Sequence, residues 1–150
     1  MEQPIRRPRV GVGVMILKDG KVLLGHRNAN AEKASSALHG EGTWTMPGGK
    51  LDFHEDLEDA ICREVLEETN LTINKEKLKV ISVTNEVVPD AHFVTIGFLS
   101  EDVTGELKTM EPEEITEWKW FPIDALPTPM YPTSAKMVRN FLAKDLRNVH

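Results

Sequence analysis

The chain has 150 residues, of which 40% are hydrophobic, and a formal net charge of −6 at pH 7. This length and composition predict one domain over residues 1–150. The negative charge argues against a nucleic-acid polymer or an anionic membrane as a partner, because clustered Lys and Arg bind such surfaces. A lone cysteine, Cys62, excludes an internal disulfide framework, and the absence of a signal peptide or long apolar run predicts a cytoplasmic protein.

Two strands joined by a tight turn are predicted near the N-terminus. The apolar run 10–17 has the length of a strand buried on both faces, and 22–24 is a shorter strand. Asp19-Gly20 between them is typical of a two-residue hairpin turn. The basic segment IRRPR at 5–9 is interpreted as a solvated lead-in to the first strand.

Candidate ligand contacts occur in and after these strands. Gly11 and Gly13 lack the third glycine and the following helix of a dinucleotide-binding loop. We therefore interpret them as strand positions crowded by backbone or ligand. Arg27 is a candidate phosphate contact. The polar segment 28–42 is long for a loop, so it either borders a substrate, with His39 near the ligand, or is a mobile surface loop.

The segment 48–71 places carboxylates where an amphipathic helix buries apolar residues. At about 100° per residue, one apolar stripe is formed by Leu57, Ala60, Ile61 and Val65. Glu64 and Glu68 point into this stripe, and Glu67 lies on its flank. Partly buried carboxylates are costly unless a positive charge lies among them. The pattern predicts a bound cation.

Magnesium suits this set of oxygen ligands, because it prefers carboxylates and carbonyls and leaves room for substrate phosphates. The five histidines and Cys62 are scattered singly, which argues against zinc. Arg63 is placed to orient a neighbouring carboxylate through its planar fork. Gly48 and Gly49 follow a proline in a turn where backbone can approach a metal or phosphate.

The remainder of the chain predicts three more strands and a final helix. Residues 78–85 and 92–100 alternate as strands joined by a turn, and 117–121 alternates again. Thr133 and Ser134 are predicted to cap the last helix, whose apolar positions recur at helical spacing: Ala135, Val138, Phe141 and Leu142.

The segment 49–71 resembles the signature of the Nudix hydrolase family. The matching positions stand at the family's spacing: Gly49, Glu55, Arg63, Glu64, Val65, Glu67, Glu68 and Leu71. One position departs, Asn70, where the family has Gly. Gly there would end the helix in the left-handed region, and Asn is the next most tolerant residue in it. The departure therefore leaves the predicted fold and acidic site intact.

The resemblance implies an α/β fold, in which a mixed β-sheet lies between the signature helix and a C-terminal helix. It implies that Glu67, Glu68 and the Gly48 carbonyl hold Mg²⁺, with Mn²⁺ as a substitute. Glu64 would ligate or act as general base, oriented by Arg63, while Gly49 would approach the substrate.

The resemblance also implies that a glutamate outside the signature completes the metal site. We favour Glu113 for this role, with Glu111 or Glu114 as substitutes, because they are concentrated just before the 117–121 strand.

For activity, the resemblance favours hydrolysis of a nucleoside triphosphate to the monophosphate and pyrophosphate, including oxidised purines such as 8-oxo-dGTP. The alternatives are an ADP-ribose or nucleotide-sugar pyrophosphatase and a non-catalytic nucleotide-binding module. Homodimers are common in the family, and the first strand or the long loop is the expected contact.

Overall fold

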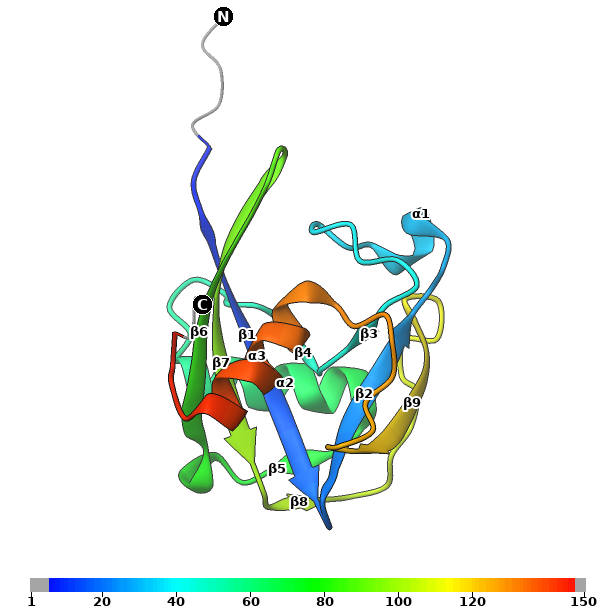
Figure 1. Ribbon diagram of the computed structural model, residues 1–150, viewed down its shortest axis with the longest axis vertical. Coiled ribbons are helices and arrows are strands. Elements are labelled where there is room, and N and C mark those ends of the chain that lie inside the picture. The colour runs from blue at the N-terminus through cyan, green and yellow to red at the C-terminus, as the bar shows by residue number, and fades with distance from the viewer. Residues whose placement is uncertain (1–5, 148–150) are drawn as a thin grey trace, which may run out of the picture.

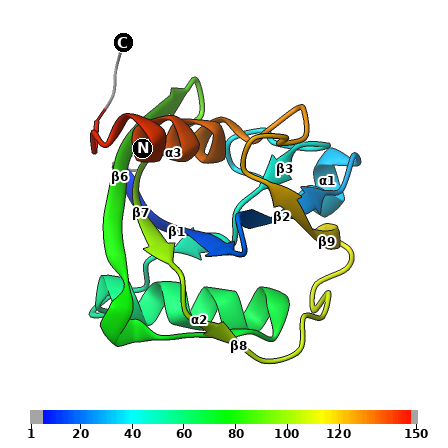
Figure 2. The same ribbon diagram turned by 60° about the horizontal axis from the view of Figure 1, so that its bottom comes forward.

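The computed structural model describes residues 6–147 and contains a mixed β-sheet with a long helix on each side (Figures 1 and 2). The strands are β1 Arg9–Lys18, β2 Lys21–Arg27, β3 Trp44–Thr45, β4 Gly48–Lys50, β5 Thr72–Ile73, β6 Lys79–Val88, β7 Ala91–Ser100, β8 Val103–Thr104 and β9 Ile115–Pro122. The helices are α1 Ala31–Ala34, α2 Leu57–Thr69, the 3₁₀ turn η1 Lys75–Lys77 and α3 Pro132–Ala143.

The main sheet has the strand order β3-β2-β1-β7-β6, with β4 also pairing to β1 and β9 to β2. The central pair, β1 and β7, is parallel and keeps one register from Arg9 opposite Phe93 to Ile16 opposite Ser100. The other described pairs in this sheet are antiparallel. A separate small ribbon joins β5 and β8.

Alternate residues of β1 supply two hydrophobic cores, one on each face of the sheet. Val12, Val14 and Ile16 pack with Ile61 and Val65 of α2. On the other face, Met15 belongs to a core formed with α3 and its neighbours, namely Val22, Leu24, Met46, Leu99, Met137 and Val138. This arrangement confirms the predicted layers of helix, mixed sheet and helix (Figure 2). No described helix is long and apolar enough to cross a membrane.

The two predicted hairpins are present, and their strands are longer than the sequence pattern indicated. Asp19 and Gly20 have φ values of 52° and 74°, as a two-residue turn between twisted strands requires. β6 and β7 form a long ribbon whose tip, at Pro89-Asp90, projects beyond the body beside the start of β1 (Figure 1).

The predicted cap of the last helix was wrong. α3 begins earlier, with Tyr131 as the N-cap residue, no side-chain cap and Pro132 at the first helical position. Proline is preferred there because its missing N–H would have no helical partner. Thr133 and Ser134 are therefore buried residues of the first turn, and the Ser134 hydroxyl accepts a 2.9 Å hydrogen bond from the Met46 N–H.

Asn70 ends α2 in the left-handed region, with φ 64° and ψ 7°, as the sequence predicted. Its N–H donates to the Leu66 carbonyl at 3.1 Å. Its side-chain amide also donates to the Glu106 carbonyl at 2.9 Å, which connects the helix end to the segment after β8.

Substitution of Asn70 should separate the effects of backbone strain and this hydrogen bond. We expect Asn70→Gly to leave the free energy of unfolding nearly unchanged, because relief of left-handed strain offsets a hydrogen bond worth about 1 kcal/mol. Asn70→Ala loses the bond and keeps the strain, so it should cost about 1–2 kcal/mol. Urea unfolding of the parent chain and the two variants measures both changes in the free energy of unfolding. Equal stability of Asn70→Ala and the parent chain would contradict the role of the cap.

Candidate active site

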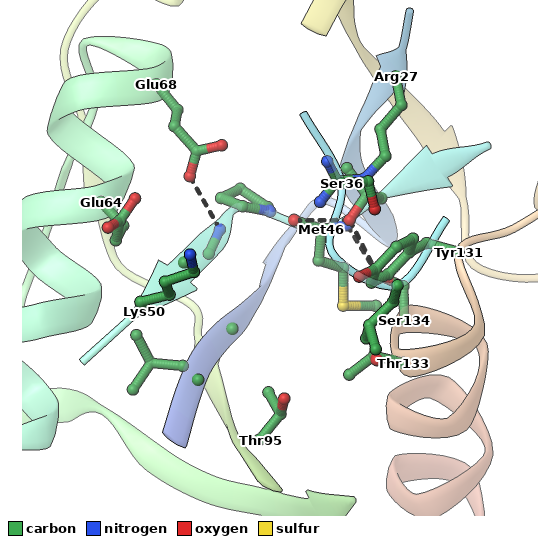
Figure 3. A pocket seen from close by; sticks show the side chains of 18 of the residues that line it. Arg27, Ser36, Met46, Lys50, Glu64, Glu68, Thr95, Tyr131, Thr133 and Ser134 are labelled. Atoms are coloured by element: carbon green, nitrogen blue, oxygen red, sulfur yellow. Dashed lines mark hydrogen bonds between the residues drawn. The ribbon is translucent and has the colours of Figure 1, made fainter. Parts of the chain in front are cut away.

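A cleft of about 440 Å³ opens between α2 and the start of α3. Figure 3 shows Glu64 and Glu68 on the α2 side and Thr133 and Ser134 on the α3 side. Backbone from β1 and β4 lies between them and contributes Gly11, Gly13, Gly48 and Gly49 to the lining. The predicted acidic and glycine positions thus come together in one cavity.

Helix α2 presents three carboxylates to this cleft with different degrees of exposure. Glu68 is 8% exposed, and its Oε1 accepts a 2.9 Å hydrogen bond from the Gly48 N–H. The side chain of Glu64 is 15% exposed and that of Glu67 is 53% exposed. The helical spacing therefore places two of the three carboxylates in partly or fully dehydrated positions, as their location in the apolar stripe predicted.

Burial raises the pKa of Glu68 well above its usual range, despite the opposing hydrogen bond from Gly48. Burial also raises the pKa of Glu64, opposed by its contact with Arg63. Neighbouring carboxylates add to both shifts, with Glu111 acting on each of them. Negative charge at this site is therefore unfavourable without further positive charge.

Arg63 connects the carboxylates to the surrounding backbone. Its guanidinium makes a bidentate contact with Glu55, at 2.8 Å from Nε and 2.9 Å from Nη2. Nη1 donates to Glu64 Oε1 at 2.8 Å, and Nη2 donates to the Lys50 carbonyl at 3.2 Å. A planar fork with five donors can hold these groups together in one plane, whereas an ammonium cannot.

Glu55 anchors this arrangement from the loop before α2. Hydrogen bonds from Arg63 and from the Asp52 N–H lower the pKa of Glu55 to about 2. It therefore remains ionised at any ordinary pH and keeps the Arg63 fork oriented. The resulting contacts fix Arg63 and, through it, the Glu64 carboxylate.

Gly48 and Gly49 permit close approach of β4 to its neighbours. A Cβ at position 48 would overlap the Val12 carbonyl oxygen, and one at position 49 would overlap the Glu64 carboxylate. Any side chain at these positions would displace β1 backbone or the Glu64 carboxylate. The absence of side chains here keeps the acidic face of α2 open to the cleft.

The opposite wall contains a cation and several hydroxyl groups. The Arg27 guanidinium stacks on the Tyr131 ring at 4.5 Å, and its buried Nε has no hydrogen-bond partner among the described residues. The hydroxyl groups that line the cleft belong to Ser35, Ser36, Thr45, Thr95, Tyr131, Thr133 and Ser134. Arg27 was predicted as a phosphate contact, whereas no periodic pattern pointed to the contributions of Tyr131 and Thr133.

The structure places His39 outside the lining of this cleft. Its Nε2 lies 2.9 Å from Asp90 Oδ1 at the tip of the β6–β7 ribbon. This contact connects the 28–42 segment to the ribbon, while Ser35, Ser36, Ala37 and Leu38 of the same segment line the cleft. The long segment therefore borders the cavity through residues preceding His39.

The cleft and its acidic helix lie within a segment that matches a known protein family. The NUDIX domain family model matches residues 7–141, a range that includes the acidic helix, the glycine turn and Arg63.

This chain belongs to the Nudix family.

Two relatives in the Nudix family are similar to the chain over much of its length. An ADP-ribose pyrophosphatase of Methanocaldococcus jannaschii is 32% identical over 120 residues, covering 80% of this chain and 65% of the relative. An NAD-capped RNA hydrolase NudC of Yersinia enterocolitica is 34% identical over 94 residues, covering 63% of this chain and 34% of the relative. The chain thus spans between one third and two thirds of the length of these two relatives.

The fold also matches solved Nudix structures. A MutT NUDIX hydrolase from Burkholderia pseudomallei superposes with a TM-score of 0.79 at 30% identity, covering 90% of this chain and 98% of that one. Nearly all of that chain therefore corresponds to the fold described above.

Divalent metals are general in Nudix hydrolases, and the donor set of this chain fits one. Glu64, Glu67, Glu68 and the Gly48 backbone offer oxygen ligands of the kind that Mg²⁺ prefers. Within residues 6–147 no three acidic, His or Cys side chains already converge on one point, because Glu64 faces Arg63 and Glu68 faces Gly48. The raised pKa values of these two buried carboxylates nevertheless indicate a deficit of positive charge that a cation would correct.

The glutamates outside the Nudix signature are positioned differently from our expectation. Glu111 and Glu114 line the cleft, whereas Glu113 lines only a separate neighbouring pocket. Burial and the charges of Glu114 and Glu67 raise the pKa of Glu111. The arrangement therefore favours Glu111, the substitute named with Glu113, for a role at the acidic site.

Substitution of these glutamates tests that reassignment. We expect Glu111→Gln to lower the maximal rate several-fold and to raise the Mg²⁺ concentration needed for half-activity, because it removes a carboxylate that interacts with Glu64 and Glu68. Glu113→Gln is the matched control and should behave as the parent chain, since both glutamates are exposed but Glu113 is not part of the cleft lining. Titration of activity with Mg²⁺ distinguishes the two variants. A defect in Glu113→Gln alone would assign the role to Glu113 instead of Glu111.

Proposed function

We infer that this Nudix protein hydrolyses a nucleoside triphosphate to the nucleoside monophosphate and pyrophosphate with Mg²⁺, including oxidised purine nucleotides such as 8-oxo-dGTP. The observation that carries this proposal is the acidic face of α2, which Arg63 and β4 hold open to a cleft of about 440 Å³. That volume lies in the usual range of small-molecule sites. An acidic site that faces a guanidinium across a cleft suits a phosphorylated ligand that brings or shares metal ions.

The residues divide between holding metal and handling the proton. Glu67, Glu68 and the Gly48 carbonyl would hold Mg²⁺, with Mn²⁺ as a substitute, and bound metal would neutralise phosphate charge and lower the pKa of water. Glu64, with its raised pKa, is suited either to ligate or to accept the proton of the attacking water. The water oxygen bonds to one phosphorus of the α–β bridge as the bond from that phosphorus to the bridging oxygen breaks. One product, the nucleoside monophosphate or pyrophosphate, carries the water oxygen, and the other departs with the bridging oxygen.

Arg27 supplies the positive charge on the far side of the cleft. Its burial and its stacking on Tyr131 hold the guanidinium in place before a ligand arrives, and its Nε has no hydrogen-bond partner among the described residues. A preorganised guanidinium favours binding of a phosphate because little side-chain entropy is lost. We assign Arg27 to the phosphate furthest from the α2 carboxylates.

A second candidate substrate is ADP-ribose or another nucleotide sugar. The archaeal relative that matches 80% of this chain bears the name ADP-ribose pyrophosphatase. Both substrate classes carry a diphosphate attached to a nucleoside, and the acidic helix serves either. A non-catalytic binding module is the least supported alternative, because each acidic signature residue is present and the Arg63 contacts are formed.

A substrate panel with identified products tests the proposal. The panel contains the (d)NTPs, their oxidised forms, ADP-ribose and dinucleoside polyphosphates, each assayed with Mg²⁺, with Mn²⁺ and with a chelator. Release of pyrophosphate and nucleoside monophosphate from a triphosphate is the expected result. Release of AMP and ribose 5-phosphate from ADP-ribose alone would favour the second candidate, and metal-independent binding without turnover would favour the module.

A further inference from the structure

A second groove, also of about 440 Å³, adjoins the catalytic cleft. It lies between the residues that enter β1 and the tip of the β6–β7 ribbon. Its lining includes three arginines, Arg6, Arg7 and Arg9. Ala37 and Phe93 line both cavities, so the groove and the cleft share a wall.

The sheet register makes the groove a continuation of the cleft floor. Gly11 lies opposite Thr95, and both residues line the cleft. Arg9 lies opposite Phe93, two residues earlier on each strand. Side chains two apart on a strand share a face, and two residues span about 7 Å. One uninterrupted face of β1 and β7 therefore leads from the catalytic floor to Arg9.

The charge of the groove is opposite to that of the catalytic cleft. Within residues 6–147, no carboxylate lies within ion-pair distance of Arg6, Arg7 or Arg9. Asp90 is the acidic residue in the lining, and it already contacts His39 at 2.9 Å. Asp90 also attracts Arg6 at longer range. Among the described residues, the groove thus offers three guanidinium groups with no carboxylate in direct contact, on a chain whose net charge is −6. Residues 6–9 are exposed and lead into β1, in agreement with the solvated lead-in predicted for 5–9, of which Ile5 lies outside the described range.

We propose that this groove binds a second phosphate, carried by the sugar of the nucleotide whose 5′-phosphates occupy the acidic cleft. The proposal rests on the proposed function, which places the 5′-phosphates beside α2. Arginine guanidinium groups bind phosphate oxygens in a bidentate manner, and the apolar Val87, Val88 and Phe93 give the same groove a surface for a sugar or base. The phosphate belongs either to a free nucleoside bisphosphate or to the first phosphodiester of an oligonucleotide.

Equilibrium binding of matched nucleotides tests this site. AMP is compared with adenosine 3′,5′-bisphosphate and adenosine 2′,5′-bisphosphate, and the guanosine series is measured in parallel by calorimetry. We expect one bisphosphate to bind the parent chain at least about tenfold more tightly than the monophosphate, with a stronger dependence on salt. The dinucleotide pApA, compared with AMP, distinguishes the two sources of the second phosphate. A similar gain in affinity would extend the site to oligonucleotides, and no gain would restrict it to free bisphosphates.

Charge-neutralising variants test which arginines bind the second phosphate. In a chain carrying Arg7→Gln and Arg9→Gln, the preference for the bisphosphate should fall below about twofold, while AMP binding is retained. Arg139→Gln makes the same charge change on the exposed face of α3, outside both cavities, and should keep the full preference. All three arginines are exposed, so melting temperatures should agree.

Two outcomes separate this proposal from the proposed function. Equal binding of mono- and bisphosphates by the parent chain, or a preference that survives in the Arg7→Gln, Arg9→Gln chain, would overturn the second phosphate site, whatever the substrate panel shows. Absence of turnover across the substrate panel would overturn the proposed function, and an arginine-dependent preference would still support the groove.

Discussion

Glu68→Gln is expected to lower turnover at least about 100-fold while the fold persists, and Glu67→Gln should do the same. Both changes remove a carboxylate from the acidic face of α2, and charge stabilisation by metal supplies most of the barrier reduction in phosphoryl transfer. The hydrogen bond to β4 survives the first change, because the amide oxygen of glutamine can still accept from the Gly48 N–H. Steady-state rates at saturating Mg²⁺, with circular dichroism to check folding, measure the effect.

Stability of the metal-free protein gives an independent readout of the same change. Burial raises the pKa of Glu68, which means that its ionised form destabilises the folded state. Glu68→Gln should therefore leave the melting temperature of the metal-free protein unchanged or higher. Glu76→Gln, an exposed change on η1, is the control and should keep full activity. Full activity of Glu68→Gln would refute the assignment of α2 as the catalytic helix.

Arg63→Lys is expected to lower turnover between about 10- and 100-fold, the range typical of residues that orient metal ligands. Lysine keeps the positive charge but cannot make the bidentate contact with Glu55 while also holding Glu64 and the Lys50 carbonyl. The Mg²⁺ concentration for half-activity should rise in parallel. Arg139→Lys on α3 is the matched control and should keep the turnover of the parent chain. Unchanged kinetics in Arg63→Lys would show that a positive charge at position 63 is sufficient for activity without the planar fork.

The pH dependence of stability should change in the same Arg63→Lys variant. The folded-state pKa of Glu55 is lowered from 4.5 to about 2, chiefly by Arg63. A lowered pKa contributes stability that is present above pH 4.5 and is lost as the pH falls toward 2. The parent chain should therefore lose stability over this window, and Arg63→Lys should lose less. Urea unfolding at several pH values between about 2 and 6 measures the difference.

The acidic part of the site was predictable because it lies within one helix. Spacing along α2 is enough to place Glu64 and Glu68 in an apolar stripe, and helical geometry then decides their burial. The same reasoning located the strands that alternate over several residues. The left-handed end of α2 at Asn70 was likewise a local property of the chain.

The remaining site residues depend on tertiary contacts that no local pattern encodes. Glu111 and Glu113 are neighbours in an irregular segment, so their sequence positions do not say which one faces the cleft. Tyr131 contacts Arg27 from more than one hundred residues away. The short strands β3 and β4 have too few residues to show a period. The start of α3 was misplaced because Thr133 and Ser134 resemble caps, while Pro132 determined the first turn.

The parallel pairing of β1 with β7 also bears on how the protein is made. β1 is synthesised early, yet its partner strand lies about eighty residues further along the chain, and the cleft is completed only by α3. Closing so long a loop is slow because chain entropy is lost before contacts compensate it. On the ribosome, the acidic helix would therefore emerge well before the cavity that it serves, and the nascent chain acquires its binding site among the last steps of folding.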